Sequence, residues 1–138
     1  MARVANADRG TIHDAVETHS RIFRDLMLGF VRIHVLHHAS NEPIYGSGIS
    51  AELERHGYRL SWGTLYPLLH SLTAEGFLAR EEQVVDGKVR KYYRITPLGR
   101  RALQSARDKA LELVNEITQG DVVVDGNPVR ARVPRKPA

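Results

Sequence analysis

The stretch that decides the fold is LSWGTLYPLLHSL, residues 60–72. Four of its leucines recur at i, i+3, i+4 and i+7, which places them on one face of a helix that ends at Gly76. These residues are Leu65, Leu68, Leu69 and Leu72. Pro67 has no N–H group and its ring clashes one turn back, so it has to lie near the helix start. Either the regular helix begins near Thr64, which puts Pro67 at its third position, or residues 61–64 form a tighter first turn.

The irregular start of this helix is a candidate binding surface. It presents backbone N–H groups and polar or aromatic side chains outward, as contact with a phosphate requires. The candidate contact residues off the leucine face are Ser61, Trp62, Thr64, Tyr66 and His70. For two of them a structural role is equally open, because Tyr66 can serve as a packing residue and Trp62 can cover the seam between two helices.

A long helical pattern precedes this stretch. Apolar residues recur at helical spacing from Thr11, which is a suitable N-cap, to about Ala39. Gly29 leaves open whether this is one helix or two. Apolar residues between Phe23 and Leu36 lie on more than one face of the helix. This pattern predicts burial against a partner subunit as well as against the chain's own core.

Turn residues mark the limits of a short second helix. The segment SNEPIYG, residues 40–46, ends the first helix and changes the direction of the chain. A short helix then starts at Ser47 or Gly48 and is closed by Gly57 in the C′ position.

After Gly76 the period changes from helical to alternating. The segments FLAREEQVV and KVRKYYRI flank Asp86-Gly87, the strongest short signal for a type I′ hairpin. One face of the second strand carries Val89, Tyr93 and Ile95, and we expect it to pack. The other face carries Lys88, Arg90, Tyr92 and Arg94 and stays available for contact. The candidate phosphate contacts of this hairpin are Lys88, Arg90 and Lys91.

Thr96-Pro97 opens a final helix, with Thr96 as the N-cap and Pro97 where its missing N–H costs nothing. Apolar residues follow at alternating intervals of three and four, a seam suited to packing against another helix. The seam residues are Leu103, Ala106, Ala110, Leu113 and Ile117. After Gly120 the chain is basic and rich in proline, so we expect residues 120–138 to be disordered.

Composition limits the classes of protein to which the chain can belong. A chain of 138 residues, 42% hydrophobic, can build one domain with a core. Its net charge of +4 favours a polyanionic partner, and the absence of cysteine fits a reducing compartment. No apolar run approaches the roughly 18 residues of a membrane span, and the N-terminus has no signal-peptide pattern. We therefore expect a cytoplasmic protein without a membrane partner.

Motifs of catalysis are absent from the sequence. It contains no G-x-S-x-G or H-E-x-x-H, and Gly46-Ser47-Gly48 lacks the lysine and the preceding strand of a phosphate loop. We therefore predict that the chain is not an enzyme. A winged helix used only for protein interaction would need a neutral or acidic wing, whereas this hairpin is basic.

The order of helix, helix, helix, hairpin and helix is that of a winged helix-turn-helix. Two segments resemble the PadR family of bacterial transcriptional regulators over roughly residues 25–118. The first, residues 45–78, is YGSGISAELERHGYRLSWGTLYPLLHSLTAEGFL, and the second, residues 87–103, is GKVRKYYRITPLGRRAL. The resemblance implies a homodimeric repressor that binds double-stranded operator DNA and is released by a small-molecule effector. It also implies that the C-terminal helix supplies much of the dimer contact.

We accordingly expect a mainly α protein with a two-stranded wing, an added N-terminal helix and a C-terminal dimerisation helix. The division is as follows: a disordered N-terminus in residues 1–10, a winged helix-turn-helix DNA-binding domain with the helix extension in 11–96, the dimerisation helix in 97–119, and a basic disordered tail in 120–138.

Seven histidines are many for a chain of this length. His34 and His38 are four residues apart on the first predicted helix, a spacing at which two imidazoles can share a divalent transition metal ion. No cysteine exists and no acidic residue completes the set locally, so a further ligand has to come from another helix or subunit. Two interpretations stay open: a solvated or hydrogen-bonded histidine cluster, and a metal-responsive winged-helix regulator.

Overall fold

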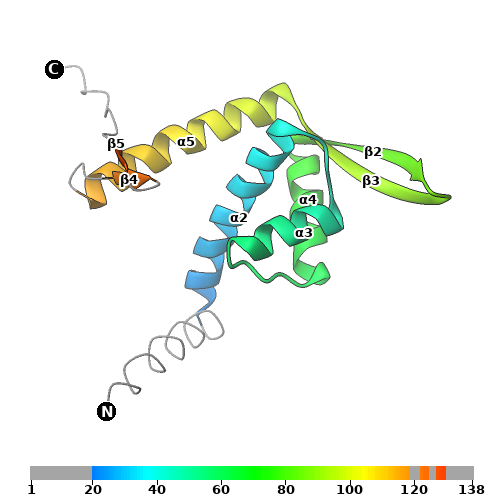
Figure 1. The fold of residues 1–138 in the computed structure, drawn as a ribbon, viewed down its shortest axis with the longest axis horizontal. Helices are drawn as coiled ribbons and strands as arrows, with labels where there is room; N and C mark the ends of the chain where they lie inside the picture. Colours follow the sequence, from blue (N-terminus) through cyan, green and yellow to red (C-terminus); the bar gives the residue numbers. More distant parts are fainter. Residues whose placement is uncertain (1–19, 119–121, 125–126, 130–138) are drawn as a thin grey trace, which may run out of the picture.

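The computed structural model describes residues 20–118, 122–124 and 127–129, and in these ranges it has a mainly helical fold with a β-hairpin wing (Figure 1). The helices are α2 (Arg21–Asn41), α3 (Gly46–Arg55), α4 (Trp62–Ala74) and α5 (Pro97–Ile117). The strands are β1 (Ile44–Tyr45), β2 (Leu78–Val85), β3 (Lys88–Ile95), β4 (Val122–Val124) and β5 (Asn127–Val129). None of the described helices is long and apolar enough to span a bilayer.

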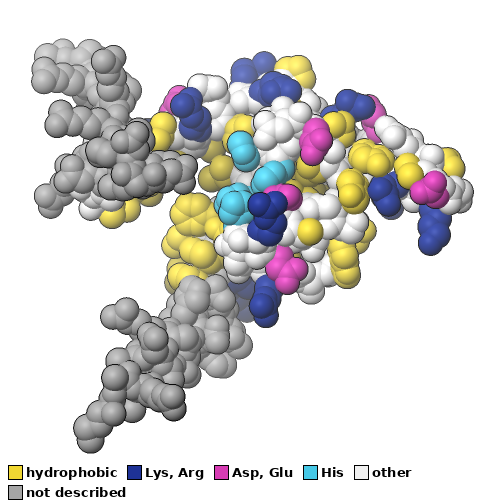
Figure 2. Space-filling model, in the orientation of Figure 1, with side chains coloured by type: hydrophobic (Ala, Val, Ile, Leu, Met, Phe, Trp, Pro, Cys, Tyr) yellow, Lys and Arg dark blue, Asp and Glu magenta, His cyan; other side chains and the backbone are white. Residues whose placement is uncertain are grey.

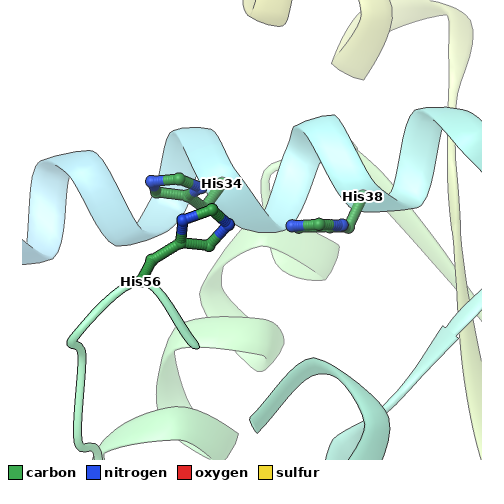
Figure 3. A group of neighbouring side chains, drawn as sticks. All are labelled: His34, His38 and His56. Carbon is green, nitrogen blue, oxygen red and sulfur yellow. The ribbon is translucent and has the colours of Figure 1, made fainter. Parts of the chain in front are cut away.

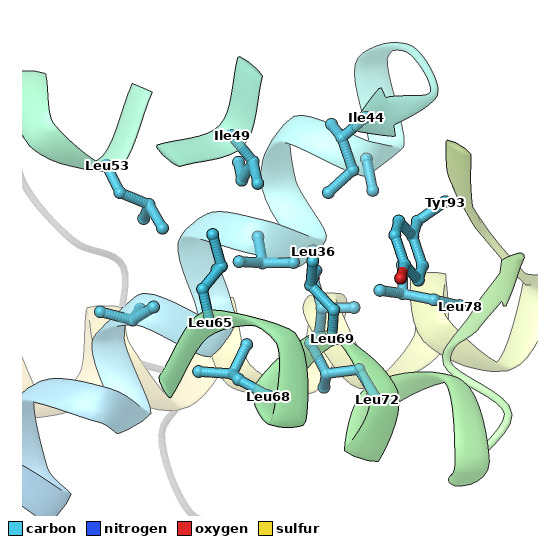
Figure 4. Packing of buried hydrophobic residues seen from close by; sticks show 13 residues of the cluster. Leu36, Ile44, Ile49, Leu53, Leu65, Leu68, Leu69, Leu72, Leu78 and Tyr93 are labelled. Atoms are coloured by element: carbon cyan, nitrogen blue, oxygen red, sulfur yellow. The ribbon is translucent and has the colours of Figure 1, made fainter. Parts of the chain in front are cut away.

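The core lies between α2, α3 and α4 (Figure 4). All four leucines predicted for one face of α4 are buried, and Leu65 and Leu69 have no exposed surface. They belong to one cluster with Val31 and Val35 of α2 and with residues of α3 and the wing base. The leucine face predicted from the sequence is therefore confirmed.

Pro67 lies inside α4 rather than at its third position. The helix begins at Trp62 after the N-cap residue Ser61, so the alternative in which it begins near Thr64 is wrong. The N–H groups of Thr64 and Leu65 both donate to the carbonyl oxygen of Ser61, at 3.0 Å each. The bond from Thr64 spans three residues, as in a 3₁₀ turn, so the tighter first turn is confirmed.

The helix α2 has a clear start and no interruption. The hydroxyl of Ser20 accepts a hydrogen bond of 3.1 Å from the N–H of Phe23, which caps the described helix. The helix continues unbroken through Gly29, so the described residues form one helix. The predicted N-cap Thr11 and the predicted disorder of residues 1–10 lie outside the described residues.

A strand that the sequence did not predict joins α2 to α3. Ile44 and Tyr45, which we expected in a turn, form β1 and pair with Tyr93 and Tyr92 of β3. Two residues are too few to show a period in the sequence, and the strand exists because β3 lies beside it. The sheet has the order β1-β3-β2, so β3 is its central strand. The helix α3 then begins at Gly46, slightly before the predicted start.

The hairpin turn has the predicted geometry. Asp86 and Gly87 have φ angles of 51° and 75°, both positive as a type I′ turn requires. The base of the wing packs as expected, because Tyr93 is buried. Val89, expected on the same packed face, is instead 64% exposed. The reason is that the hairpin extends beyond the body of the molecule (Figure 1).

Thr96 joins the end of α4, the wing and α5. Its hydroxyl accepts a hydrogen bond of 3.0 Å from the N–H of Gly99 and donates to the carbonyl oxygen of Gly76. Its own N–H donates to the carbonyl oxygen of Phe77 at 3.1 Å. The predicted N-cap is thus confirmed. Gly99 is needed here because a Cβ at this position would overlap the Phe77 oxygen and lie 2.9 Å from Cγ1 of Ile95.

The expectation of disorder in residues 120–138 has to be corrected for the two strands that the structure describes there. β4 and β5 pair antiparallel, with Val122 opposite Val129 and Val124 opposite Asn127. Three consecutive valines are β-branched and favour a strand. This propensity outweighs the basic, proline-containing composition on which the expectation rested. The remaining residues of the tail lie outside the described residues.

We predict that Gly99→Ala lowers the free energy of unfolding by about 2 kcal/mol or more. The added methyl group would overlap a backbone oxygen that is held by the Thr96 hydrogen bond. Denaturant unfolding followed by circular dichroism measures the change. Gly63→Ala is the control, since a Cβ there meets only the Ser61 hydroxyl, at 3.8 Å, and should be neutral. Equal losses in both variants would contradict the role given to the junction.

Candidate nucleic-acid interface

Three predicted contact residues form the outward face of α4. Trp62, Tyr66 and His70 follow one another at intervals of four residues and point away from the buried leucines. Trp62 and Tyr66 are 49% and 47% exposed, and their rings stack with centroids 5.4 Å apart. His70 is exposed as well. We call these three residues the recognition face.

A groove of about 350 Å³ lies between the recognition face, the start of α3 and strand β3. We call it the α4–wing groove, and its lining residues are Tyr45, Gly46, Ser47, Trp62, Tyr66, Val89, Arg90, Lys91 and Tyr93. A Cβ at Gly46 would lie 3.0 Å from the hydroxyl oxygen of Tyr66, so a larger residue there would displace the tyrosine. The structure therefore brings residues of α4 and of the wing, which the sequence places apart, into one groove.

The positive charge of the wing is unevenly neutralised. Arg94 forms an ion pair of 2.9 Å with Glu81, and Arg80 forms one of 3.5 Å with Glu82. Lys88, Arg90 and Lys91 form no ion pair with any residue in the described ranges. We call these three residues the wing cations. The guanidinium of Arg90 lies over the ring of Tyr45, 4.5 Å from its centroid, and Lys88 is the wing cation outside the groove.

The two hydroxyl residues predicted at the start of α4 contact each other. The side-chain oxygens of Ser61 and Thr64 are 3.2 Å apart, and Arg24 of α2 donates to the Thr64 hydroxyl at 3.2 Å. The Ser61 side chain caps no N–H group of the helix, so the first turn can still donate to an anion. Arg24 adds a positive charge beside this helix start.

Some residues of this interface were missed by the sequence analysis. Tyr45 was missed because β1, which places it against β3, was not predicted. Ser47 was considered only as a possible helix start, although it lines the α4–wing groove. Arg24 was missed because it meets Thr64 only through the packing of α2 on α4. No local pattern in the sequence could have indicated these contacts.

The seam predicted for dimerisation divides into two parts. Leu103 packs against the core, and Ala106 and Ala110 are half-buried. Leu113 and Ile117 are exposed, by 55% and 71%. Further apolar residues of the described helices are also exposed, namely Leu111 and Val114 on α5 and Ile22, Leu26 and Phe30 on α2. Figure 2 shows hydrophobic side chains gathered over α2.

The two histidines predicted as metal ligands are joined by a third. His34 and His38 lie on α2, and the C-cap residue of α3, His56, lies beside them. Burial lowers the pKa of His34, and the neighbouring His56 and His38 lower it further. Burial also lowers the pKa of His38. Both imidazoles therefore favour the neutral form near neutral pH.

The sequence matches the Transcriptional regulator PadR-like family over residues 35–105. This segment begins in α2, spans the helix-turn-helix and the wing, and ends in α5. The chain is also 47% identical, over 104 residues, to Transcriptional regulator Rv3488 of Mycobacterium tuberculosis. That alignment covers 75% of this chain and 97% of the relative.

Solved structures of similar proteins show the same fold. A PadR family transcriptional regulator from Eggerthella lenta has a TM-score of 0.66 and 31% identity, covering 79% of this chain and 94% of that chain. A PadR-like transcriptional regulator from Bacillus cereus has a TM-score of 0.60 and 30% identity, covering 70% of this chain and 98% of that chain. These relatives are regulators of transcription rather than enzymes. The chain therefore belongs to the PadR-like family of transcriptional regulators.

Proposed function

We propose that the protein binds duplex DNA in a sequence-specific manner, as a homodimer, and represses transcription. The observation that carries this proposal is the α4–wing groove, where the recognition face meets wing cations that no described carboxylate neutralises. A helix fits into the major groove, which is about 12 Å wide. The adjoining wing then lies along the phosphate backbone.

The interface residues divide into two kinds of contact. The recognition face offers two flat rings, a hydroxyl and an imidazole, which suit base edges and the thymine methyl group. The wing cations suit phosphates, because each phosphate contact releases a counterion. Ser61 and Thr64 add hydroxyl groups and the N–H groups of the first turn of α4, which suit a phosphate at the helix end.

The exposed apolar residues of α2 and α5 support the homodimer. Soluble monomers rarely leave a large apolar patch open to water. On α2 the residues Ile22, Leu26 and Phe30 follow one another at intervals of four, so they share one face of the helix. On α5 Leu113 and Ile117 have the same spacing. A second copy of the chain that offers the same two faces would cover both.

The dimer gives a reason for repression. Two α4 helices would contact half-sites about one helical turn, or roughly 34–36 Å, apart on the DNA. A protein that occupies such a site within a promoter blocks access to it, so we infer a repressor. Release by a small-molecule effector stays a prediction that rests on the family resemblance.

Sequence preference is the first test of this function. We predict that fluorescence anisotropy detects tighter binding to a duplex from the protein's own promoter region than to a shuffled duplex of equal length and composition. Tyr66→Ala should reduce this preference, by about 1–3 kcal/mol for each base pair whose contact is lost. Equal affinities for both duplexes at every salt concentration would contradict the proposal.

A second prediction concerns the wing cations. Replacing Lys88 and Lys91 together with alanine should weaken binding to all duplexes and flatten the dependence of affinity on salt, by about 0.9 in the log–log slope for each lost phosphate contact. Affinity titrations between low and physiological salt measure this slope.

The matched control for this variant removes the same charge from the same hairpin. Arg80 and Arg94 are already paired with glutamates, so changing both to alanine should leave the salt slope nearly unchanged. A salt slope that falls equally in the two double variants would show that only the total charge of the wing matters.

A third prediction concerns the dimer. Leu113→Glu should make the protein monomeric, because it would bury a charge in the subunit contact. The monomer should bind operator DNA far more weakly, since it contacts one half-site. Gln104→Glu is the control, because this exposed residue lies on the opposite face of α5. Sedimentation velocity distinguishes the states, and a fully dimeric Leu113→Glu would place the contact elsewhere.

A further inference from the structure

Three histidines from two helices meet on one side of α2 (Figure 3). His34 and His38 project from α2 one turn apart, and His56 faces them from the end of α3. The rings of His34 and His56 are closest, with centroids 4.5 Å apart. One nitrogen of each ring lies within 4.8 Å of a nitrogen of each of the other two.

One nitrogen of this cluster lacks a partner that its burial requires. The Nε2 atom of His38 is inaccessible to solvent and forms no hydrogen bond with any described residue. Leaving a buried polar atom unpaired is unfavourable, and such atoms call for a specific explanation. An ion bound at this nitrogen would provide the missing partner.

We propose that the three imidazoles bind a divalent transition metal ion, with Zn²⁺ as the best match. Imidazole nitrogen is a preferred zinc ligand, and three histidines with one further position form a known type of zinc site. A Zn–N distance of about 2.0–2.1 Å places the nitrogens of a tetrahedral site roughly 3.4 Å apart. The nitrogens therefore have to approach one another by about 1.4 Å where they lie furthest apart.

The surroundings allow the three imidazole nitrogens to approach one another, and they also accommodate the positive charge of the metal ion. His56 is exposed and is followed by Gly57, so its ring is free to move. The negative charge of Glu52 acts on His38 and favours a positive charge there. Glu52 also forms an ion pair of 3.1 Å with Arg55, which offsets the positive charge of this arginine near the site. Glu52 and His38 line one cavity of about 240 Å³, which has room for water molecules beside His38.

A metal ion at this place joins α2 to the helix-turn-helix. His56 is the C-cap residue of α3, at the start of the turn that leads from α3 to α4. An ion that binds the folded chain and not the unfolded one stabilises the fold by mass action. The ion binding itself does not depend on the proposed DNA function, whereas any effect of zinc on repression does.

The test is calorimetric titration of metal-free protein with zinc chloride. Wild-type protein should bind one ion per chain, and its melting temperature should rise by several degrees in excess zinc. His56→Ala should bind zinc at least tenfold more weakly and show no such rise. This variant should melt like the wild type without metal, because the His56 side chain is exposed.

Two further variants make the test specific to these residues. His37→Ala is the matched control, since His37 adjoins His38 on α2 but is not one of the three grouped histidines. It should keep the wild-type affinity. The double variant His34→Gln, His38→Gln should bind zinc as weakly as His56→Ala. Equal zinc binding by the wild type and His56→Ala, or a loss confined to His37→Ala, would overturn the proposal. No DNA is present, so this outcome is separate from failure of the proposed function.

Discussion

Burial of one face of α4 is the constraint on which the rest of the structure depends. Leu65 and Leu69 have no exposed surface, and the other two leucines of this face are buried as well. Exposing such a side chain costs about 1.5–3 kcal/mol, so α4 cannot rotate about its axis without a large loss of stability. The recognition face is on an exposed side of the same helix, next to the leucine face. The packing of the leucines therefore holds Trp62, Tyr66 and His70 toward solvent, and these residues need few interactions of their own.

Backbone hydrogen bonds place the wing beside this face. The strand β3 is paired on both sides, and its partner β1 runs directly into α3. At the other end, Thr96 bonds to the chain at Gly76 and Phe77, just after α4. The wing is thus attached both to the start of α3 and to the end of α4. Since backbone pairing rather than side-chain ion pairs places the wing at the α4–wing groove, the charges of the wing cations stay without an ion pair among the described residues.

The sequence predicted the features that local interactions decide. The leucine period, the turn at residues 86–87 and the Thr96 cap each depend on residues within a few positions of one another. The candidate contacts on α4 could be named for the same reason, because the leucine period also shows which residues lie off the buried face. In contrast, β1, the contact of Arg24 with Thr64 and the approach of His56 to the other histidines depend on tertiary packing. No period or cap in the sequence could indicate them.

The helix α2 connects three surfaces that would otherwise be independent. Its buried residues all lie in its second half, where Val31 and Val35 face the core. Its first half carries the exposed Ile22 and Leu26, and the histidines project from a further side. The 21 residues of α2 form one unbroken helix, so a single element carries all three surfaces. In the proposed dimer, metal binding at the histidines would therefore act on the same helix that carries the exposed apolar residues of the subunit contact. Half-sites on DNA have a fixed spacing, so a shift of α2 in the proposed dimer would change how well its two α4 helices match them.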